Sequence, residues 1–149
     1  MTDLVEKSER FVGELLAGLG LKITPAARWS DEGCHIDLSG ADSHLARAEN
    51  GELLDALEVI LFQAFGRELE RHQRFLVDAE GYRERRRAEL EAMAQFAADK
   101  VRTSGQPFVF GILNSTERRM IHLALKEQTD LVTESVGEGR QRRLQVRLK

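Results

Sequence analysis

The sequence predicts an α+β protein of two small domains, each a three-stranded sheet packed on helices, joined by a long helix. Segments with helical spacing of apolar residues alternate with short strand-like runs along the whole chain. The 149 residues, 42% of them hydrophobic, are enough to bury a core. Residues 1–80 hold 8 Lys and Arg against 16 Asp and Glu, a net charge of −8, whereas residues 99–149 hold 10 against 6, a net charge of +4. We therefore expect domains over residues 1–80 and 81–149, of which only the second has the charge that suits a polyanion.

Hydrophobic periodicity places the elements of the first half. Apolar residues recur at steps of three and four in the helices, and Cys34, Ile36 and Leu38 alternate with polar residues in a strand with one buried face. The expected elements are a helix over residues 2–18, strands over 22–29 and 34–39, a short helix and a loop over 40–51, a helix over 52–69, and a strand over 71–78.

The second half begins with the long helix, on which Leu90, Ala94 and Val101 share one stripe. Phe96 and Phe108 also fall at positions that periodicity assigns to the core, so we expect neither to be a platform for stacked bases. The expected elements are a helix over residues 80–105, a strand over 106–114, a helix over 115–128, and strands over 131–135 and 141–149.

The helix over residues 115–128 carries cations on one face. Asn114, followed three residues later by Glu117, is a capping-box variant that starts the helix. Arg118, His122 and Lys126 then lie one above another, near the positive end of the helix dipole, which suits phosphate oxygens. The residues expected to point into the core are Ile121, Ala124 and Leu125.

The last strand extends the same surface, because Arg143, Gln145 and Arg147 alternate with apolar residues. Two explanations fit this spacing. The commoner one is an ordinary solvated face of charged residues, and the other is a phosphate-binding edge.

Four stretches resemble the Arg-x-x-x-His domain as it occurs in the bacterial Jag family, where it follows a KH domain. They are "VDAEGYRERR", "KVRTSGQP", "NSTERRMIHLAL" and "TESVGEGRQRRLQV", and they occur in the order and spacing of the family. The resemblance runs from about residue 30 to the C-terminus, and the separate N-terminal Jag segment is expected to have no counterpart here. The matching residues are Asp78, Gly81, Tyr82, Arg83, Gly105, Asn114, Glu117, Arg118, Arg119, His122, Ser135, Gly137 and Arg142.

The resemblance implies binding of single-stranded nucleic acid, chiefly RNA with single-stranded DNA as the alternative, and Arg118 and His122 would be the signature pair. It also implies that the first domain is a KH-like α/β sandwich. The residues expected to contact nucleic acid are Arg118, Arg119, His122, Lys126, Arg142, Arg143 and Arg147.

The loop by which a KH domain holds the nucleic-acid backbone is degenerate in this sequence. Such a loop has the pattern Gly-x-x-Gly, which lets phosphates approach the backbone amides. Here Ala48 replaces the first glycine, Glu49 and Asn50 stand where the Jag family has lysine and arginine, and Gly51 matches the second glycine. Because the change adds a methyl group and reverses the local charge, we expect the KH-like half to bind RNA poorly.

The sequence predicts a binding protein and not an enzyme. Cys34 is the only cysteine, and its neighbour His35 would point to the opposite face of a strand, so the two cannot form a catalytic pair. No phosphate loop, dinucleotide fingerprint or metal-binding spacing is present, and we expect no cofactor and no metal. No apolar run is long enough to cross a membrane and no signal peptide is recognised, which favours a cytoplasmic location.

Two functions from different classes remain open. In the first, the chain is a low-specificity RNA-binding module whose affinity comes mainly from the second domain. In the second, the degenerate KH domain makes the chain an interaction scaffold that forms a homodimer or docks with another KH protein.

Overall fold

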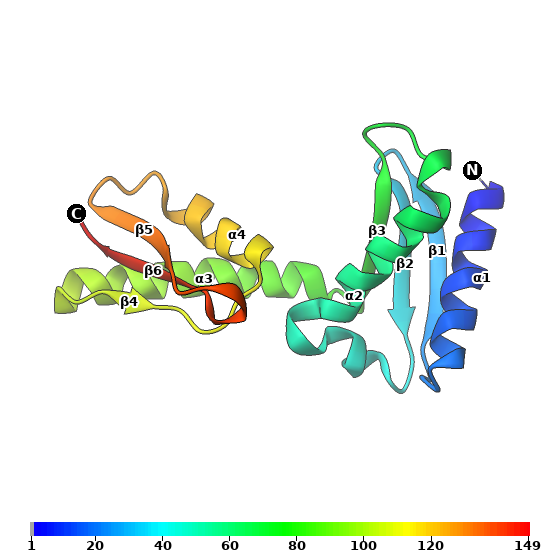
Figure 1. The fold of residues 1–149 in the computed structure, drawn as a ribbon, viewed down its shortest axis with the longest axis horizontal. Helices are drawn as coiled ribbons and strands as arrows, with labels where there is room; N and C mark the ends of the chain where they lie inside the picture. The colour runs from blue at the N-terminus through cyan, green and yellow to red at the C-terminus, as the bar shows by residue number, and fades with distance from the viewer. Residues whose placement is uncertain (1) are drawn as a thin grey trace. The chain divides into compact units, whose positions relative to one another are not determined.

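The computed structural model describes residues 2–149 and confirms the α+β class, with two three-stranded sheets and helices packed on each (Figure 1). The chain divides into two compact units, Met1–Arg83 and Glu84–Lys149. Each unit has its own hydrophobic core.

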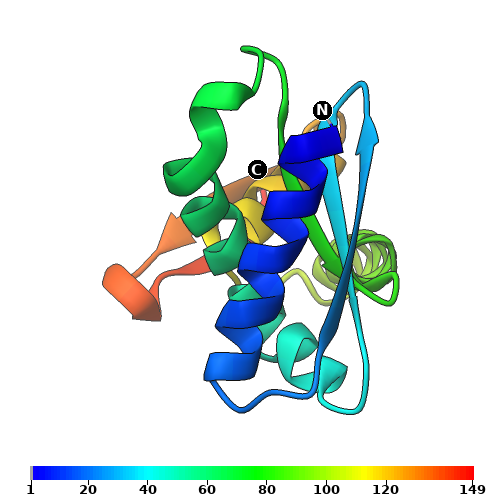
Figure 2. The ribbon, with the colours of Figure 1, turned by 90° about the vertical axis from the view of Figure 1, so that its right-hand side faces the viewer.

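The first unit packs two helices on the buried face of its sheet. Strand β2 lies in the centre of the order β1-β2-β3, antiparallel to β1 and parallel to β3, and α2 makes the crossover that a parallel pair requires. Figure 2 shows α1 and α2 together on one side of the strands. Its elements are α1 (Thr2–Gly18), β1 (Thr24–Ser30), β2 (Gly33–Ser39), α2 (Ser43–Phe65), the 3-10 turn η1 (Gly66–Glu68) and β3 (Arg74–Ala79).

The expected elements of this unit are confirmed, with shifts of a few residues at their ends. The predicted short helix and loop appear as a break inside α2, where Ala48 to Gly51 leave the helical conformation. The predicted alternation in β2 is confirmed as well, because Cys34, Ile36 and Leu38 are buried. The following helix ends at Phe65, four residues earlier than expected, and continues only as the turn η1.

The second unit packs α3 and α4 on one face of an antiparallel sheet with the strand order β4-β6-β5. Its core joins Leu90 and Val101 of α3, Ile121 and Leu125 of α4, and Val146 of β6. Its elements are α3 (Tyr82–Ser104), which begins in the last two residues of the first unit, β4 (Phe108–Val109), α4 (Ser115–Leu125), β5 (Leu131–Val136), the 3-10 turn η2 (Gly139–Gln141) and β6 (Arg143–Leu148).

Two expectations for this unit are wrong. The strand expected over residues 106–114 is reduced to Phe108–Val109, because Pro107 before it lacks a donor and Gly111 after it favours a bend. Phe96, expected in the core, is 60% exposed on α3. The buried stripe of α3 is narrow and made mainly of alanines, and the larger ring of Phe96 lies beside this stripe and stays at the surface.

No helix within residues 2–149 is both long and apolar enough to cross a membrane.

Candidate nucleic-acid interface

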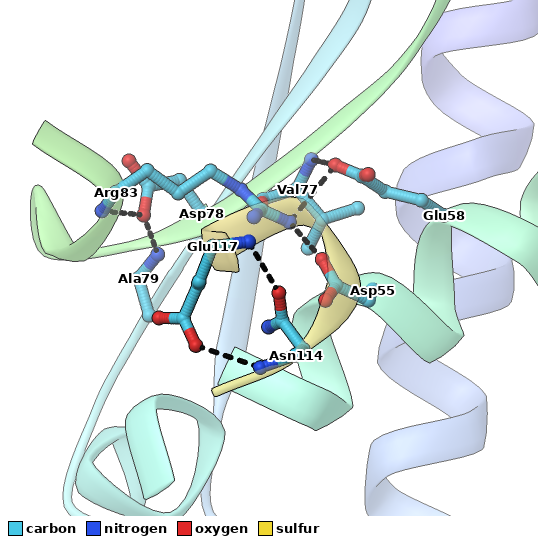
Figure 3. Close-up of polar contacts among 8 residues, drawn as sticks. All are labelled: Asp55, Glu58, Val77, Asp78, Ala79, Arg83, Asn114 and Glu117. Carbon is cyan, nitrogen blue, oxygen red and sulfur yellow. Dashed lines mark hydrogen bonds and ion pairs between the residues drawn. The ribbon is translucent and has the colours of Figure 1, made fainter. Parts of the chain in front are cut away.

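The predicted capping box starts α4. The Asn114 side-chain oxygen accepts the Glu117 backbone N–H at 2.8 Å, and the Glu117 carboxylate accepts the Asn114 backbone N–H at 3.2 Å (Figure 3). This reciprocal pair satisfies two donors of the first turn and sets the direction in which the following side chains leave the helix.

Glu117 has a second role that the sequence did not reveal. Its side chain is buried, and the carboxylate accepts a hydrogen bond from Nε of Arg86 at 2.6 Å. Arg86 lies in the first turns of α3, so this ion pair ties the start of α4 to α3. The run "RERRR" signalled only a charged helix face, and nothing in its spacing singled out Arg86.

Arg118 and His122 project from α4 toward the edge strand β5. The Arg118 guanidinium is half-buried, and its Nη1 donates a hydrogen bond to the Leu113 carbonyl at 2.7 Å. The His122 ring is exposed, and its Nδ1 contacts the Thr133 hydroxyl of β5. Among the residues that the structure describes, neither Arg118 nor His122 forms an ion pair with a carboxylate.

A depression of about 380 Å³, open to solvent, lies beside these two residues. It combines three guanidiniums and an imidazole with hydroxyl groups, whereas Glu134 is its one acid. That carboxylate accepts hydrogen bonds from Arg147 at 3.0 Å and Gln145 at 3.2 Å. Such a set of donors around a net positive site suits an anion with several oxygens. The lining residues are Ser115, Arg118, Arg119, His122, Thr133, Glu134, Ser135, Arg142 and Leu144.

The structure therefore brings four of the seven expected contact residues together, namely Arg118, Arg119, His122 and Arg142. The other three lie outside the depression. Lys126 is exposed at the C-terminal end of α4, beyond the last helical residue.

Arg143 and Arg147 lie on the outer face of β6, alternating with the buried Leu144 and Val146 as expected. Arg147 pairs with Glu134, so part of its charge is neutralised by an acid of the depression.

One expectation for the core side of α4 is wrong. Ile121 and Leu125 are buried, but Ala124 is exposed. The buried stripe runs through residues 117, 121 and 125 at four-residue steps, and a residue three positions from Ile121 falls at its edge.

The degenerate loop of the first unit has three consecutive residues in the left-handed conformation, with φ of 54° at Glu49, 58° at Asn50 and 77° at Gly51. Ala48 and Glu49 are exposed, whereas Gly51 is buried. A Cβ at Gly51 would lie 2.9 Å from the Tyr82 ring, so the absence of a side chain at Gly51 lets this ring pack closely against the loop.

Two other residues of the motif stretches have structural contacts. Asp78 accepts the backbone N–H groups of Ala79 at 2.8 Å and Arg83 at 3.2 Å (Figure 3). The Arg83 guanidinium donates to the Val77 carbonyl, to Asp55 and to Glu58, at 2.8, 3.0 and 3.1 Å. These bonds hold the start of α3 against the end of β3 and against α2.

The described residues contain no group of three or more His, Cys, Asp or Glu side chains that could hold a metal ion. Cys34 and His35 point to opposite faces of β2, as expected: Cys34 is buried, which raises the pKa of its thiol, and His35 lies 2.7 Å from the Ser30 hydroxyl.

Comparison with known proteins gives matches over both units. Residues 88–148 match the R-3-H domain, the family defined by the Arg-x-x-x-His pair. The chain is 27% identical over 148 residues to the RNA-binding protein KhpB of Clostridium symbiosum, a match that covers 98% of this chain and 67% of that protein. It is 26% identical over 144 residues to the RNA-binding protein KhpB of Bacillus subtilis strain 168, covering 95% of this chain and 69% of that protein.

Proposed function

Because the chain belongs to the Jag family, in which a KH domain precedes an Arg-x-x-x-His domain, we propose that it binds single-stranded RNA and holds the phosphates in the depression beside α4. Both relatives above are named RNA-binding proteins, which supports a binding role rather than an enzymatic one. The observation that carries the proposal is the convergence of Arg118, Arg119, His122 and Arg142 on one open depression.

The contacts of Arg118 and His122 suit this role. The Leu113 carbonyl holds the Arg118 guanidinium at one nitrogen, so its other N–H groups can meet phosphate oxygens in a fixed orientation. Thr133 likewise orients the His122 ring through Nδ1, which leaves Nε2 directed away from β5. The hydroxyls of Ser115 and Ser135 supply neutral donors around the same space.

We assign the phosphate contacts mainly to the second unit because of charge. Glu49 is exposed in the degenerate loop, within a half of the chain whose net charge is −8. A carboxylate at this point repels the backbone that a KH loop would otherwise hold.

A salt titration of RNA binding tests the proposal. The affinity of the full chain for an oligouridine should fall steeply as salt rises, and Arg118→Ala and His122→Ala should both weaken it. Arg118→Ala should also flatten the dependence of log K on log salt by about 0.7 for each phosphate that the variant no longer neutralises.

Arg87→Ala is the matched control. Arg87 is an exposed arginine of the same unit that pairs with Glu84 and lies outside the depression. Its removal should change affinity little. Equal losses of RNA affinity in Arg87→Ala and Arg118→Ala would mean that RNA responds to the overall positive charge of the unit and not to the depression. Absence of RNA binding by the wild type at low salt would refute the proposal.

A second candidate function is a protein-interaction scaffold, and one feature of the first unit favours it. The outer face of α2 exposes Val59 and Phe62, one turn apart, with exposed fractions of 57% and 59%. Two large apolar side chains on one exposed face of a helix suit a partner helix.

This candidate is a homodimer, or a pair with another KH protein, formed through α2. Sedimentation of the chain should show self-association that Val59→Lys with Phe62→Lys abolishes. Leu19→Lys, at an apolar residue of the same unit that is 61% exposed, should leave it intact. A wild-type chain that stays monomeric at all concentrations rules out the homodimer.

A further inference from the structure

An apolar pocket between α3 and β4 has no part in the phosphate site. It has a volume of about 300 Å³, and no charged side chain lines it. Its lining residues are Ala92, Met93, Phe96, Phe108, Phe110 and Gly111.

Three aromatic rings lead from the core into this pocket. Phe110 is buried, and its ring centroid lies 5.1 Å from that of Phe108 at an interplanar angle of 72°. The Phe108 ring in turn lies 5.9 Å from Phe96 at 79°. The edge contact with Phe108 joins the Phe96 ring to the core, yet Phe96 remains 60% exposed. A ring in contact with the core thus presents open surface to solvent.

The side of α3 that carries Phe96 also suits a nucleotide. Lys100 lies one turn further along the helix, on the same side, and is exposed. Ala92 lies one turn before and leaves space beside the ring. An aromatic face with a cation one turn away is the combination by which proteins bind single strands, because the ring stacks on a base while the cation attracts the phosphate.

The register of the sheet relates this pocket to the phosphate depression. Phe108 of β4 and Thr133 of β5 both pair with Val146 of β6, so the three form one row across the sheet. Adjacent strands lie about 4.8 Å apart, which separates Phe108 from Thr133 by about 10 Å. Since Thr133 contacts His122, the pocket and the depression lie at opposite edges of one small sheet. The outer face of β6 between these edges carries Arg143 and Arg147.

We propose that this pocket binds a nucleobase, stacked on Phe96, of the same single strand whose phosphates occupy the depression. The proposal rests on the proposed function. Every base has a flat face, so the site tolerates different sequences and adds affinity without adding salt dependence.

The test compares two ligands of equal length, an oligothymidine and the same strand without bases, on the full chain. Phe96→Ala should weaken oligothymidine binding by about fivefold or more and leave the strand without bases unaffected. Phe96→Tyr, which keeps a ring, should retain the affinity. The salt dependence should be the same in wild type and Phe96→Ala, whereas Arg118→Ala should alter it for both ligands.

Leu19→Ala is the control, because Leu19 is as exposed as Phe96 but lies in the other unit. Unchanged affinity of Phe96→Ala for oligothymidine, or an equal loss on the strand without bases, would overturn the base site. If Arg118→Ala still lowered binding and its salt dependence, the phosphate site would stand alone. Failure of the wild type to bind either strand would overturn the base site, whereas the proposed RNA binding is decided by the oligouridine titration. A wild-type dimer that Phe96→Ala dissociates would identify the pocket as a docking site for a second copy and also overturn the base site.

Discussion

Glu117 takes part in two interactions that meet at the start of α4, the capping box with Asn114 and the ion pair with Arg86. Glu117→Gln keeps an oxygen for the Asn114 N–H but removes the charge that Arg86 pairs with. Because the Arg86 side chain is only 19% exposed, we expect the unfolding free energy to fall by about 1–3 kcal/mol, measured by urea denaturation followed by circular dichroism.

Glu89→Gln is the control for this change. Glu89 also pairs with Arg86, at 3.0 Å, but its side chain is 62% exposed, so its loss should cost under about 1 kcal/mol. Equal losses for the two variants would mean that burial of Glu117 adds nothing to the pair.

Asp130 gives the second unit a dependence on pH. Arg102 donates two hydrogen bonds to its carboxylate, at 2.8 and 2.9 Å, and lowers its pKa below the ordinary value of 3.8. A carboxyl group with a lowered folded pKa stabilises the fold above its unfolded pKa, and this contribution is lost as the pH falls through the folded pKa.

Asp130→Asn should therefore be less stable than wild type at neutral pH, and the difference should shrink as the pH falls below 3.8. Denaturation curves at a series of pH values measure it. Asp31→Asn, in an exposed turn, should show no such trend. A difference that stays constant down to low pH would contradict the assignment to Arg102.

At the scale of elements, the break inside α2 depends on Gly51. Its φ of 77° favours glycine, and a Cβ would lie 2.9 Å from the Tyr82 ring. Gly51→Ala should therefore suffer both backbone strain and a clash. Gly20→Ala separates the strain from the clash, because Gly20 has the same φ of 77° but no atom within 4 Å of an added Cβ.

We expect Gly20→Ala to lower the unfolding free energy by about 1 kcal/mol and Gly51→Ala to lower it by more. Trp29 packs against the core of the first unit, so its fluorescence can follow both transitions. Similar losses of unfolding free energy in Gly20→Ala and Gly51→Ala would show that the clash with Tyr82 costs no stability.

At the scale of the whole molecule, the uneven charge predicts how the halves share RNA binding. Replacing Ala48, Glu49 and Asn50 by Gly, Lys and Arg should tighten RNA binding and steepen its salt dependence, because an acid is replaced and two cations are added at the loop. Fluorescence anisotropy with an oligouridine measures both.

Glu14→Lys with Ala17→Arg is the control for net charge. Both residues are exposed on α1, and the pair makes the same change in charge away from the loop. A gain of equal size in the control would assign the effect to overall charge, and no gain in the loop variant would count against a repelling loop.

The residues themselves determined the order and type of nearly every element, because periodicity and capping act within a few positions. They also placed Arg118 and His122 one turn apart on α4. Tertiary structure alone decided what lies beside that face. Arg119 and Arg142 share a depression with the pair, and Arg147 instead meets Glu134, because strand pairing joins residues distant in the chain. The exposure of Phe96 was also decided by the tertiary structure. Periodicity identifies the apolar residues of a helix, but it does not show how many of them the sheet covers.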